Sequence, residues 1–596
     1  MYISRIRIEN FRNFHNFDVQ LGENAVIVGE NKIGKSNLLH ALRLLLDPSL
    51  PDSARQLRDE DFWDGLPRPL GKRDVITISI DLADFEKDDR LLAVLGEYPI
   101  STDPMVSRLT YVFGPLRAAG EDITEADYDF LIYGGDRPDN KVGFELRRRL
   151  PLDLLHALRD AEGDLANWRK SPLRPLLDEA SAHIDRNTLK TIADEISEVT
   201  DTVSDINEID ELAESITGRL TQMVGTAHAL EMTLGFSPTS PDRLIRALRL
   251  FIDDGRRGIG EASVGSANLL YLTLTMLELE HLVEQRTRDH TFLAIEEPEA
   301  HLHPHVQRLV YRDLLQSRVH QDVKTGDEKH GVSNSTIFLT THSPHIVSVS
   351  PVRSLVLLRK ARNEQSTIGS SAARIDLEES DIEDLERYLD VTRGEMLFAK
   401  GVLLVEGDAE LFLVPALAKL NGFDLDQLGI TVSSVSGTNF APYIKLLGPE
   451  GLNVPFAILT DRDPQVGGKN LGNSRAAQLL EVLSPKLKYA EADIIDVAAK
   501  RGIFLNDFTF EVDLFKCGRH KSMCKTLLDL STNGACHERA KKWMADPSSL
   551  DSVQLLSDIS DIGKGRFAQR LASNISGTAC PIYIKQAVEY VIKRCS

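Results

Sequence analysis

Residues 26–39 read VIVGENKIGKSNLL, an apolar run followed by a glycine-bracketed loop and the first residues of a helix. The loop fits the pattern G-x-x-x-x-G-K-S in the strand, loop and helix order that a phosphate-binding loop requires. In this geometry backbone N–H groups hold the phosphates, Lys35 reaches the terminal phosphates and the Ser36 hydroxyl ligates Mg²⁺. The segment therefore predicts a P-loop domain that binds ATP with Mg²⁺. The residues assigned to the nucleotide here are Gly29, Asn31, Gly34, Lys35 and Ser36.

Two later segments supply the other groups that a nucleotide site needs. The apolar run in LAIEEPEAHLHP ends in Glu296 and Glu297. Glu296 is expected to complete the magnesium shell and Glu297 to polarise the attacking water. A second apolar run, FLTTHSP, ends in His342, which is placed to sense the terminal phosphate. Both runs predict buried strands, and their ends are expected to meet the phosphate loop.

Length and composition limit the class of protein. A chain of 596 residues exceeds one hydrophobic core, so several domains are expected. No stretch reaches the about 18 consecutive apolar residues that span a bilayer, and the opening MYISRIRIENFRNF is not a secretory signal. We expect a cytoplasmic protein with no membrane partner. The five cysteines make no disulfide framework, and no zinc is predicted because a Cys-x-x-Cys knuckle is missing from the group Cys517, His520, Cys524, Cys536 and His537.

The charge is unevenly distributed. The whole chain carries a formal charge of −21, yet residues 515–596 contain 13 Lys or Arg against 7 Asp or Glu. Phosphate binding uses clustered basic residues. A bound polyanion is therefore expected to contact the C-terminal end of the chain.

The stretch from residue 151 to about 235 is helical in character and acidic. Apolar residues recur there at spacings of three or four, which is the pattern of an amphipathic helix. The pattern fits a helix packed on its own domain and a dimerising coiled-coil arm equally, because the repeat departs from strict heptads near Ile206. The residues of this stripe are Leu189, Ile192, Ile196, Val199, Val203, Ile206, Ile209, Leu212, Ile216, Leu220 and Met223.

A second set of acidic residues follows apolar runs in the last third of the chain. GVLLVEGDAE ends its strand at Glu406 and opens a helix near Glu410, and PFAILTDRDP ends its strand with Asp461 and Asp463. Residues two apart share one face of an extended segment, so these carboxylates are expected to converge. IFLNDFTFEVDLF repeats the spacing with two further carboxylates, Glu511 and Asp513.

Crowded carboxylates raise one another's pKa unless divalent cations neutralise them. We therefore expect two divalent ions, Mg²⁺ or Mn²⁺, at this cluster. Two such ions activate a water and stabilise the leaving oxygen of a phosphodiester, which is the chemistry of many nucleases. Solvated acidic strand ends would explain one such pair but explain three in succession poorly.

The first half of the chain resembles the ABC-type ATPase heads of the RecF and SMC-like group. IRIENFRNF, the phosphate loop, IEEPEAHLHP and TTHSPHI carry the resemblance over about residues 1–350. It implies heads that work in pairs, so that a homodimer or higher homo-oligomer is expected. The signature segment would be EASVGSANLL, with Ser263 and Gly265 contacting the partner's ATP, and His301, His303 and His305 would lie where heads meet. The segment departs from Leu-Ser-Gly-Gly-Gln and Glu296 replaces the usual Asp, which implies slow hydrolysis or ATP used as a switch.

The second half resembles a Toprim domain through Glu406-Gly407-x-x-Glu410 and Asp461-x-Asp463. With RYLDVTRGEMLFAKGVLLVEGDAE, VSGTNF and an ABC-type head in front, the whole chain is similar to the OLD family of nucleases, which includes the nuclease subunit of the Gabija anti-phage system. The resemblance implies a metal-dependent DNA endonuclease or nickase in anti-phage defence or DNA processing, with a UvrD-like helicase as a candidate partner. GKGRFAQRLAS resembles the segment with the family's catalytic lysine, here Lys564. The metal ligands implied or expected are Glu406, Glu410, Asp461, Asp463, Glu511 and Asp513.

These inferences predict a multidomain α/β fold, in which an ABC-type P-loop ATPase with a helical insertion precedes a Toprim domain with C-terminal helices. The predicted head comprises residues 1–150 and 236–350, and the insertion comprises residues 151–235. A linker is predicted at 351–395 and the Toprim domain, with its basic helical end, at 396–596. The competing hypothesis is an ATP-gated DNA clamp or scaffold whose Toprim domain does not cut. A scaffold has no need of the full carboxylate set, and a cleavage assay separates the two.

Overall fold

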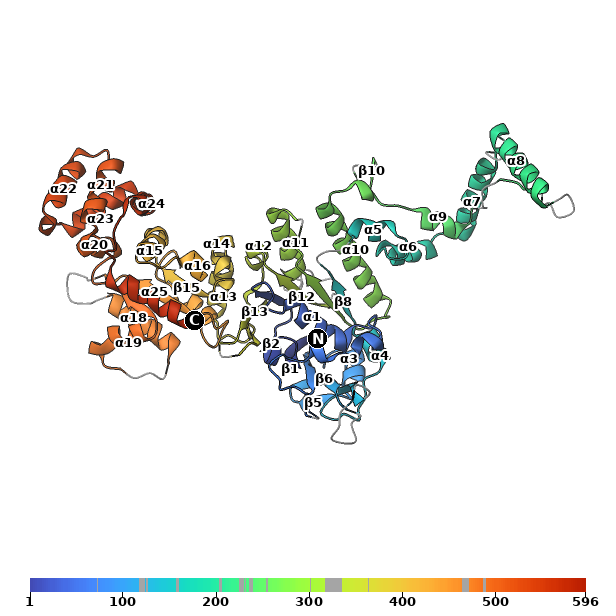
Figure 1. Ribbon diagram of the computed structural model, residues 1–596, viewed down its shortest axis with the longest axis horizontal. Coiled ribbons are helices and arrows are strands. Elements are labelled where there is room, and N and C mark those ends of the chain that lie inside the picture. Colours follow the sequence, from blue (N-terminus) through green and yellow to red (C-terminus); the bar gives the residue numbers. More distant parts are fainter. Residues whose placement is uncertain are drawn as a thin grey trace. The chain divides into compact units, whose positions relative to one another are not determined.

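The computed structural model describes residues 1–595 except 72, 117–123, 125–126, 157–159, 203–205, 225–229, 231, 235–238, 253–255, 301, 317–334, 363, 464–470 and 486–488 (Figure 1). The chain divides into two compact units. Residues 1–157, 289–299 and 303–596 form the first, and residues 158–288 and 300–302 form the second. Among the described helices, none combines the length and the apolar character needed to cross a bilayer.

The first unit begins with an antiparallel sheet of order β2-β1-β4-β6-β5, with β7 paired to β6. Its first strands alternate buried and more exposed residues, as expected where one face of a sheet is covered. The covered face carries Ile6, Ile8 and Ile80. The strands are β1 Tyr2–Phe11, β2 Phe14–Gln20, β4 Ile76–Ala83, β5 Pro99–Thr102, β6 Met105–Gly114 and β7 Asp129–Gly134.

A second sheet of the first unit has the order β14-β13-β3-β12-β11-β8 and is parallel except for β14. Its central strands are buried except at Glu296 and Ser335, and they are the strands predicted from the apolar runs before Gly29, Glu296 and His342. Parallel strands bring their carboxyl ends to one edge of a sheet. The strands are β3 Ala25–Gly29, β8 Leu152–Leu155, β11 Thr291–Glu296, β12 Ser335–Thr341, β13 Leu355–Lys360 and β14 Thr367–Ser371.

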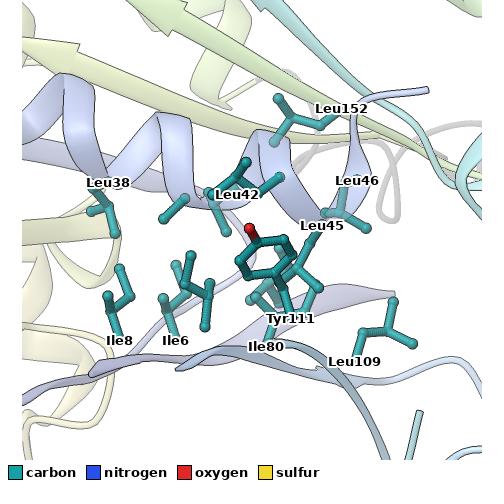
Figure 2. Packing of buried hydrophobic residues seen from close by; sticks show 14 of the residues in the cluster. Ile6, Ile8, Leu38, Leu42, Leu45, Leu46, Ile80, Leu109, Tyr111 and Leu152 are labelled. Carbon is teal, nitrogen blue, oxygen red and sulfur yellow. The ribbon is translucent and has the colours of Figure 1, made fainter. Parts of the chain in front are cut away.

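Helix α1, Lys35–Leu46, is packed between the two sheets. Figure 2 shows Leu38, Leu42 and Leu45 of this helix against Ile6 and Ile80 of the antiparallel sheet. Each fully buried Leu contributes about 1.5–3 kcal/mol through removal of apolar surface from water. This packing fixes the first turn of α1 at the end of β3. The other helices of this part are α2 Asp52–Arg55, α3 Asp89–Leu95, α4 Phe144–Arg149, α11 Pro304–Gln316 and α12 Pro344–Val347.

The predicted linker at 351–395 differs from the structure. β13 pairs with β3 in parallel and β14 pairs with β13, so this stretch supplies two strands of the head sheet. The apolar run Leu355–Leu358 is buried by that pairing, which joins residues far apart in sequence. Two helices, α13 Glu379–Tyr388 and α14 Val391–Gly394, follow before the next domain.

The second unit contains most of the predicted helical insertion and also residues 239–288, which were assigned to the head. Among the described residues of the amphipathic stripe, Ile192, Val199 and Met223 are 41%, 69% and 73% exposed. Val203 lies outside the described residues. The elements are α5 Ala161–Ala166, α6 Leu173–Ala182, α7 Arg186–Asp201, α8 Asn207–Val224, α9 Pro241–Ala247, α10 Val264–Glu284, β9 Phe251–Ile252 and β10 Arg257–Gly258.

The last third of the chain is built on a parallel sheet of order β16-β15-β17-β18. The predicted strands before Glu406 and Asp461 are its two central members, β15 and β17. The strands and the helices between them are β15 Gly401–Val405, α15 Asp408–Leu420, α16 Leu425–Leu428, β16 Ile430–Ser434, α17 Ala441–Leu447, β17 Phe456–Thr460, α18 Leu471–Leu483, α19 Ile494–Lys500, β18 Ile503–Leu505 and α20 Phe510–Leu514.

The C-terminal helices share one hydrophobic core with helix α15. Leu413 of α15 is buried together with Leu527, Trp543 and Leu571. The last helix packs on β15 and β17, and α24 packs along α15. The predicted helical C-terminal part therefore covers the sheet that carries the second acidic cluster. Its helices are α21 His520–Leu530, α22 Gly534–Ala545, α23 Ser552–Ile562, α24 Lys564–Asn574 and α25 Ile582–Cys595.

Candidate functional site

The first candidate site is the loop between β3 and α1. Gly34 precedes the helix with φ +105°, a left-handed conformation, and a Cβ there would collide with the side chain of Asn13. Only glycine suits this position. Asn13 also donates to the carbonyl of Ile33 at 2.8 Å, which ties the loop to the β1–β2 turn. Gly29 is buried at the end of the strand, while Asn31 in the loop is exposed.

Lys35 is buried where the loop closes. Its ammonium donates to the carbonyl oxygens of Gly29 at 3.1 Å and Glu30 at 3.3 Å, and to Nε2 of His342 at 2.6 Å. Desolvation lowers the pKa of Lys35, and desolvation followed by the charge of Lys35 lowers the pKa of His342. A neutral imidazole therefore accepts this bond, with its proton on Nδ1. All three N–H donors of Lys35 are thus engaged, so an incoming phosphate would have to take over one of these bonds.

The predicted acidic residues lie beside Lys35. The Ser36 hydroxyl donates to Glu296 at the end of β11, and Glu297 Oε1 lies 3.3 Å from His342 Nε2. Glu297 has φ +43°, a strained backbone conformation for a residue with a side chain. The structure thus brings Lys35, Ser36, Glu296, Glu297 and His342 to one sheet edge, as the sequence predicts.

Two contacts at this edge were missed by sequence reasoning. Nδ1 of His156, just after β8, lies 3.2 Å from Oε2 of Glu296. Glu299 accepts from the backbone N–H of His342 at 2.6 Å and from the hydroxyl of Thr341 at 2.9 Å, so it fixes the loop that carries His342. Neither residue has a spacing that marks it, because the contacts join separate strand ends.

Other residues assigned to the head lie elsewhere. Ser263 and Gly265 belong to the second compact unit, where the Ser263 hydroxyl accepts from the N–H of Ser266 at 3.2 Å and caps α10. His303 accepts from the N–H of His305 at 3.3 Å. His301 is outside the described residues. The predicted contacts of these residues with a second head stay predictions.

The second candidate site lies where β15 and β17 end. Glu406 follows β15, and its Oε1 accepts from the N–H of Asp461 at 2.9 Å, from the Thr460 hydroxyl and from Arg475 at 2.7 Å. Asp461 follows β17, and its Oδ1 accepts from the N–H of Phe510 at 3.0 Å. These bonds hold the two carboxylates at the shared edge of a parallel sheet.

Two more carboxylates are buried at this edge. Glu410, in the first turn of α15, is 8% exposed, and Glu511 on α20 is 3% exposed. Burial, then the charges of Glu511 and Glu406, raises the pKa of Glu410 to about 7. Burial, then the charges of Glu406, Glu410, Glu511 and Asp463 in that order, raises the pKa of Asp461 to about 8. The cluster therefore requires protons or cations to be stable.

Lys564 begins α24 and contacts this cluster. Its Nζ lies 3.0 Å from Oε1 of Glu511. Burial acts to lower the pKa of Lys564, but the charges of Glu511, Asp461 and Glu410 outweigh it and raise the pKa. The N-terminus of α24 approaches α15 closely at Gly565, where a Cβ would lie 3.2 Å from Asp408. The lysine is thus directed at the carboxylates by helix packing.

Glu511 and Asp513 are not on one strand face as their spacing suggested. They lie on helix α20, where residues two apart point in different directions. Glu511 faces Lys564, whereas Asp513 Oδ2 accepts from the N–H of Asp507 at 2.6 Å. Asp463 has φ +46° and its Oδ2 lies 3.3 Å from Arg475. Sequence reasoning missed Arg475, because nothing in its local pattern links it to the strand ends.

The side chains at this site are of the type that binds divalent cations, but their oxygen atoms are too far apart to hold an ion as they stand. All the converging side chains are hard oxygen donors, and buried Glu511 Oε2 has no hydrogen-bond partner within the described part of the chain. In the same part, no three acidic, His or Cys side chains already stand close enough to hold an ion. Arg475 and Lys564 contact three of the carboxylates instead, so these side chains would have to move for a cation to bind.

Comparison with known proteins places both halves. Residues 397–463 match the family of overcoming lysogenization defect protein-like TOPRIM domains, and residues 25–348 match the family described as AAA domain, putative AbiEii toxin, Type IV TA system. The C-terminal region of the Burkholderia pseudomallei OLD protein is 43% identical over 33% of this chain and 100% of that structure, with a TM-score of 0.32. The chain belongs to the OLD family.

Relatives of this OLD-family chain extend over most of its length. The OLD nuclease of Thermus scotoductus is 24% identical over 481 residues, which are 77% of this chain and 82% of that protein. Endonuclease GajA of Bacillus cereus is 23% identical over 476 residues, which are 78% of this chain and 75% of that protein. The family matches confirm the arrangement predicted from the motifs, in which an ATPase head and a Toprim domain lie on one chain.

Proposed function

We propose that this OLD-family chain is a DNA endonuclease or nickase that depends on Mg²⁺ or Mn²⁺ and is controlled by its ATPase head. The observation that carries the proposal is the convergence of the buried Glu410 and Glu511 with Asp461, Glu406 and Lys564 at one sheet edge. Two relatives named as nucleases over most of the chain support the same activity. The excess of basic residues in 515–596 supports DNA as the substrate.

Two ions would be held by Glu406, Glu410, Asp461, Asp463 and Glu511, with Asp513 as a further candidate. When bound, they supply an activated water and neutralise charge on the phosphodiester. Lys564 is placed to stabilise the charge that develops on the phosphate in the transition state. Asn506 and the N–H of Phe510 both donate to Asp461, and so they orient this carboxylate.

The head would bind ATP with Mg²⁺ and act as the switch. Lys35 would contact the terminal phosphates, while Ser36 and Glu296, already in contact, would hold the ion. Glu297 would orient the attacking water and His342 would respond to the terminal phosphate. Arg359 of β13 donates to the carbonyl of Lys400, one residue before β15, which supports a mechanical link between head and Toprim strand.

We further propose a homodimer or higher homo-oligomer in which Ser263 and Gly265 of one copy face the ATP of another. The exposed apolar residues of α7 and α8 support an arm that is covered by a second copy. A role in anti-phage defence or DNA processing in the cytoplasm, with a UvrD-like helicase partner, completes the proposal. A helicase gene beside the gene for this chain would support that partner.

The experiment that tests this proposal is cleavage of supercoiled plasmid by the full-length protein with Mg²⁺, Mn²⁺ or EDTA, each with and without ATP. Cleavage is expected only with a divalent ion, and its dependence on ATP reports the control by the head. Asp507→Asn is the matched control for the site. The Asp507 side chain is 95% exposed, and the hydrogen bond of Asp507 to Asp513 comes from its backbone N–H, which the substitution keeps. A protein that binds DNA and metal but never cuts would support the clamp or scaffold instead.

A further inference from the structure

Arg475 on α18 has no part in the function proposed above, yet its guanidinium contacts both central strand ends. Nη1 donates to Oε1 of Glu406 at 2.7 Å, to the Thr460 hydroxyl at 2.6 Å and to the carbonyl of Asp461 at 3.1 Å. Nη2 lies 3.3 Å from Oδ2 of Asp463. The side chain is 14% exposed. One partly buried cation therefore pairs with two carboxylates that are assigned to metal.

Arg475 and Lys564 divide the acidic cluster into two halves. Arg475 pairs with Glu406 and Asp463, and Lys564 pairs with Glu511. Within the described residues, Glu410 and Asp461 form no ion pair with a basic side chain. With all groups ionised, the half with Glu410, Asp461 and Glu511 has three carboxylates for one lysine, whereas the other half has two for one arginine. The first half thus attracts a divalent ion more strongly.

A divalent ion at the second half has to compete with Arg475. The guanidinium stays charged at any ordinary pH, and two cations on the same partly buried oxygens repel each other. Oε1 of Glu406 already accepts three hydrogen bonds. Of the two ion pairs of Arg475, the one with Asp463 is the easier to break. It is the longer pair, at 3.3 Å against 2.7 Å for Glu406. The Asp463 side chain is also more exposed, at 37% against 18% for Glu406. The neutral acceptors at Thr460 and Asp461 can keep the arginine nearby.

We infer that Arg475 is a built-in counter-charge for Glu406 and Asp463 in the metal-free protein, and that the second of two divalent ions binds by displacing it. The inference rests on the proposed metal-dependent function. The two ions bind in sequence, first beside Glu410, Asp461 and Glu511, and then more weakly beside Glu406 and Asp463. Arg475 is a positioning residue, because it acts through these carboxylates.

The test is calorimetric titration of full-length protein with Mn²⁺, in the wild type and in Arg475→Gln, Arg475→Lys and Arg462→Gln. We expect one tighter and one weaker ion in the wild type. Arg475→Gln keeps a hydrogen-bond donor and removes the charge, so the weaker ion is expected to bind about tenfold more tightly or better. Arg475→Lys keeps the charge and should stay close to wild type. Arg462, which is paired with Asp507 at 3.9 Å, is the control for a lost charge nearby.

A second readout is thermal unfolding in EDTA and in Mn²⁺. Arg475→Gln should unfold at a lower temperature than wild type in EDTA, and Mn²⁺ should restore most of the difference. If the variant does not fold without metal, it is prepared with Mn²⁺ and titrated with EDTA. Unchanged or weaker binding of the second ion in Arg475→Gln overturns the inference alone. A wild-type protein that binds no Mn²⁺ overturns the inference and the proposed metal site together.

Discussion

The nucleotide site and the acidic site both lie at the carboxyl ends of parallel strands, but their charges are balanced in opposite ways. At the first, Lys35 is held by carbonyl oxygens and a neutral His342, and desolvation lowers its pKa. At the second, carboxylates outnumber basic side chains, and the pKa of Asp461 rises to about 8. The charge at the nucleotide site therefore favours an anion, whereas the charge at the acidic site favours cations.

The difference also concerns how each site is held. The phosphate loop is one continuous segment whose shape depends on Gly34 and on the packing of α1. The acidic site is assembled from two strands and two helices, with basic residues in contact with its carboxylates. A substitution in the loop should therefore affect nucleotide binding alone, whereas one in the acidic site should affect metal binding, cleavage and stability together.

The largest expected effect is that of Asp461→Asn. Loss of a shared metal ligand should reduce the single-turnover cleavage rate by about a thousandfold or more, because both ions depend on the cluster. ATP binding, measured with a fluorescent nucleotide, should stay normal. Substantial residual cleavage, with a further large loss in Glu406→Ala/Asp461→Asn, would contradict a shared essential site.

The next effect sharpens the role of the basic residue in the acidic site. Lys564→Ala should lower the single-turnover rate by about a hundredfold, the scale of one strong electrostatic donor, with DNA affinity nearly unchanged. Arg570→Ala on the same helix is the matched control for a phosphate contact, and it should reduce the salt slope of DNA binding by about one unit. A normal rate at saturating DNA would remove Lys564 from the catalytic groups.

Lys35→Ala tests whether the nucleotide site is separate from the acidic site. Removal of the ammonium that faces the phosphates should weaken ATP binding about a hundredfold, while Mn²⁺ binding at the acidic site stays as in wild type. Equilibrium binding of nucleotide and of Mn²⁺ to the same preparation measures both. Loss of Mn²⁺ binding at the acidic site in this variant would show that the two sites are not separate.

A smaller effect is expected in the pH dependence of stability without metal. The folded pKa values of about 8 for Asp461 and about 7 for Glu410 lie above the ordinary 3.8 and 4.5. Between those limits the folded protein binds protons that the unfolded chain has released, so the free energy of unfolding falls as pH rises. The Tm in EDTA should therefore decrease from about pH 5 to about pH 8. Asp461→Asn should flatten this slope, and a Tm that rises over the interval would refute the assignment.

Much of this architecture follows from the sequence, for a physical reason. Strands buried on both faces read as continuous apolar runs, so β3, β11, β12, β15 and β17 are visible without a structure. Residues that end such strands are then expected at one edge. This is why Lys35, His342, Glu406 and Asp461 could be assigned to two sites.

The rest depends on contacts between distant segments. β13 is a strand of the head because it pairs with β3, which no local pattern around Leu355 reveals. Glu511 was assigned to the right cluster from the wrong local structure, since it reaches the site from a helix. Arg475 and His156 were missed because each meets its partner only through tertiary packing.

The proposed function depends on the binding of catalytic divalent ions by the carboxylates at the ends of β15 and β17. Anomalous diffraction at the manganese edge from crystals of the full-length protein soaked in Mn²⁺ tests it most directly. We expect anomalous peaks among Glu406, Glu410, Asp461 and Glu511, and we expect them to be lost in Asp461→Asn. Strong Mn²⁺ peaks at the Ser36 and Glu296 edge, with none at the acidic cluster, would contradict the proposed function.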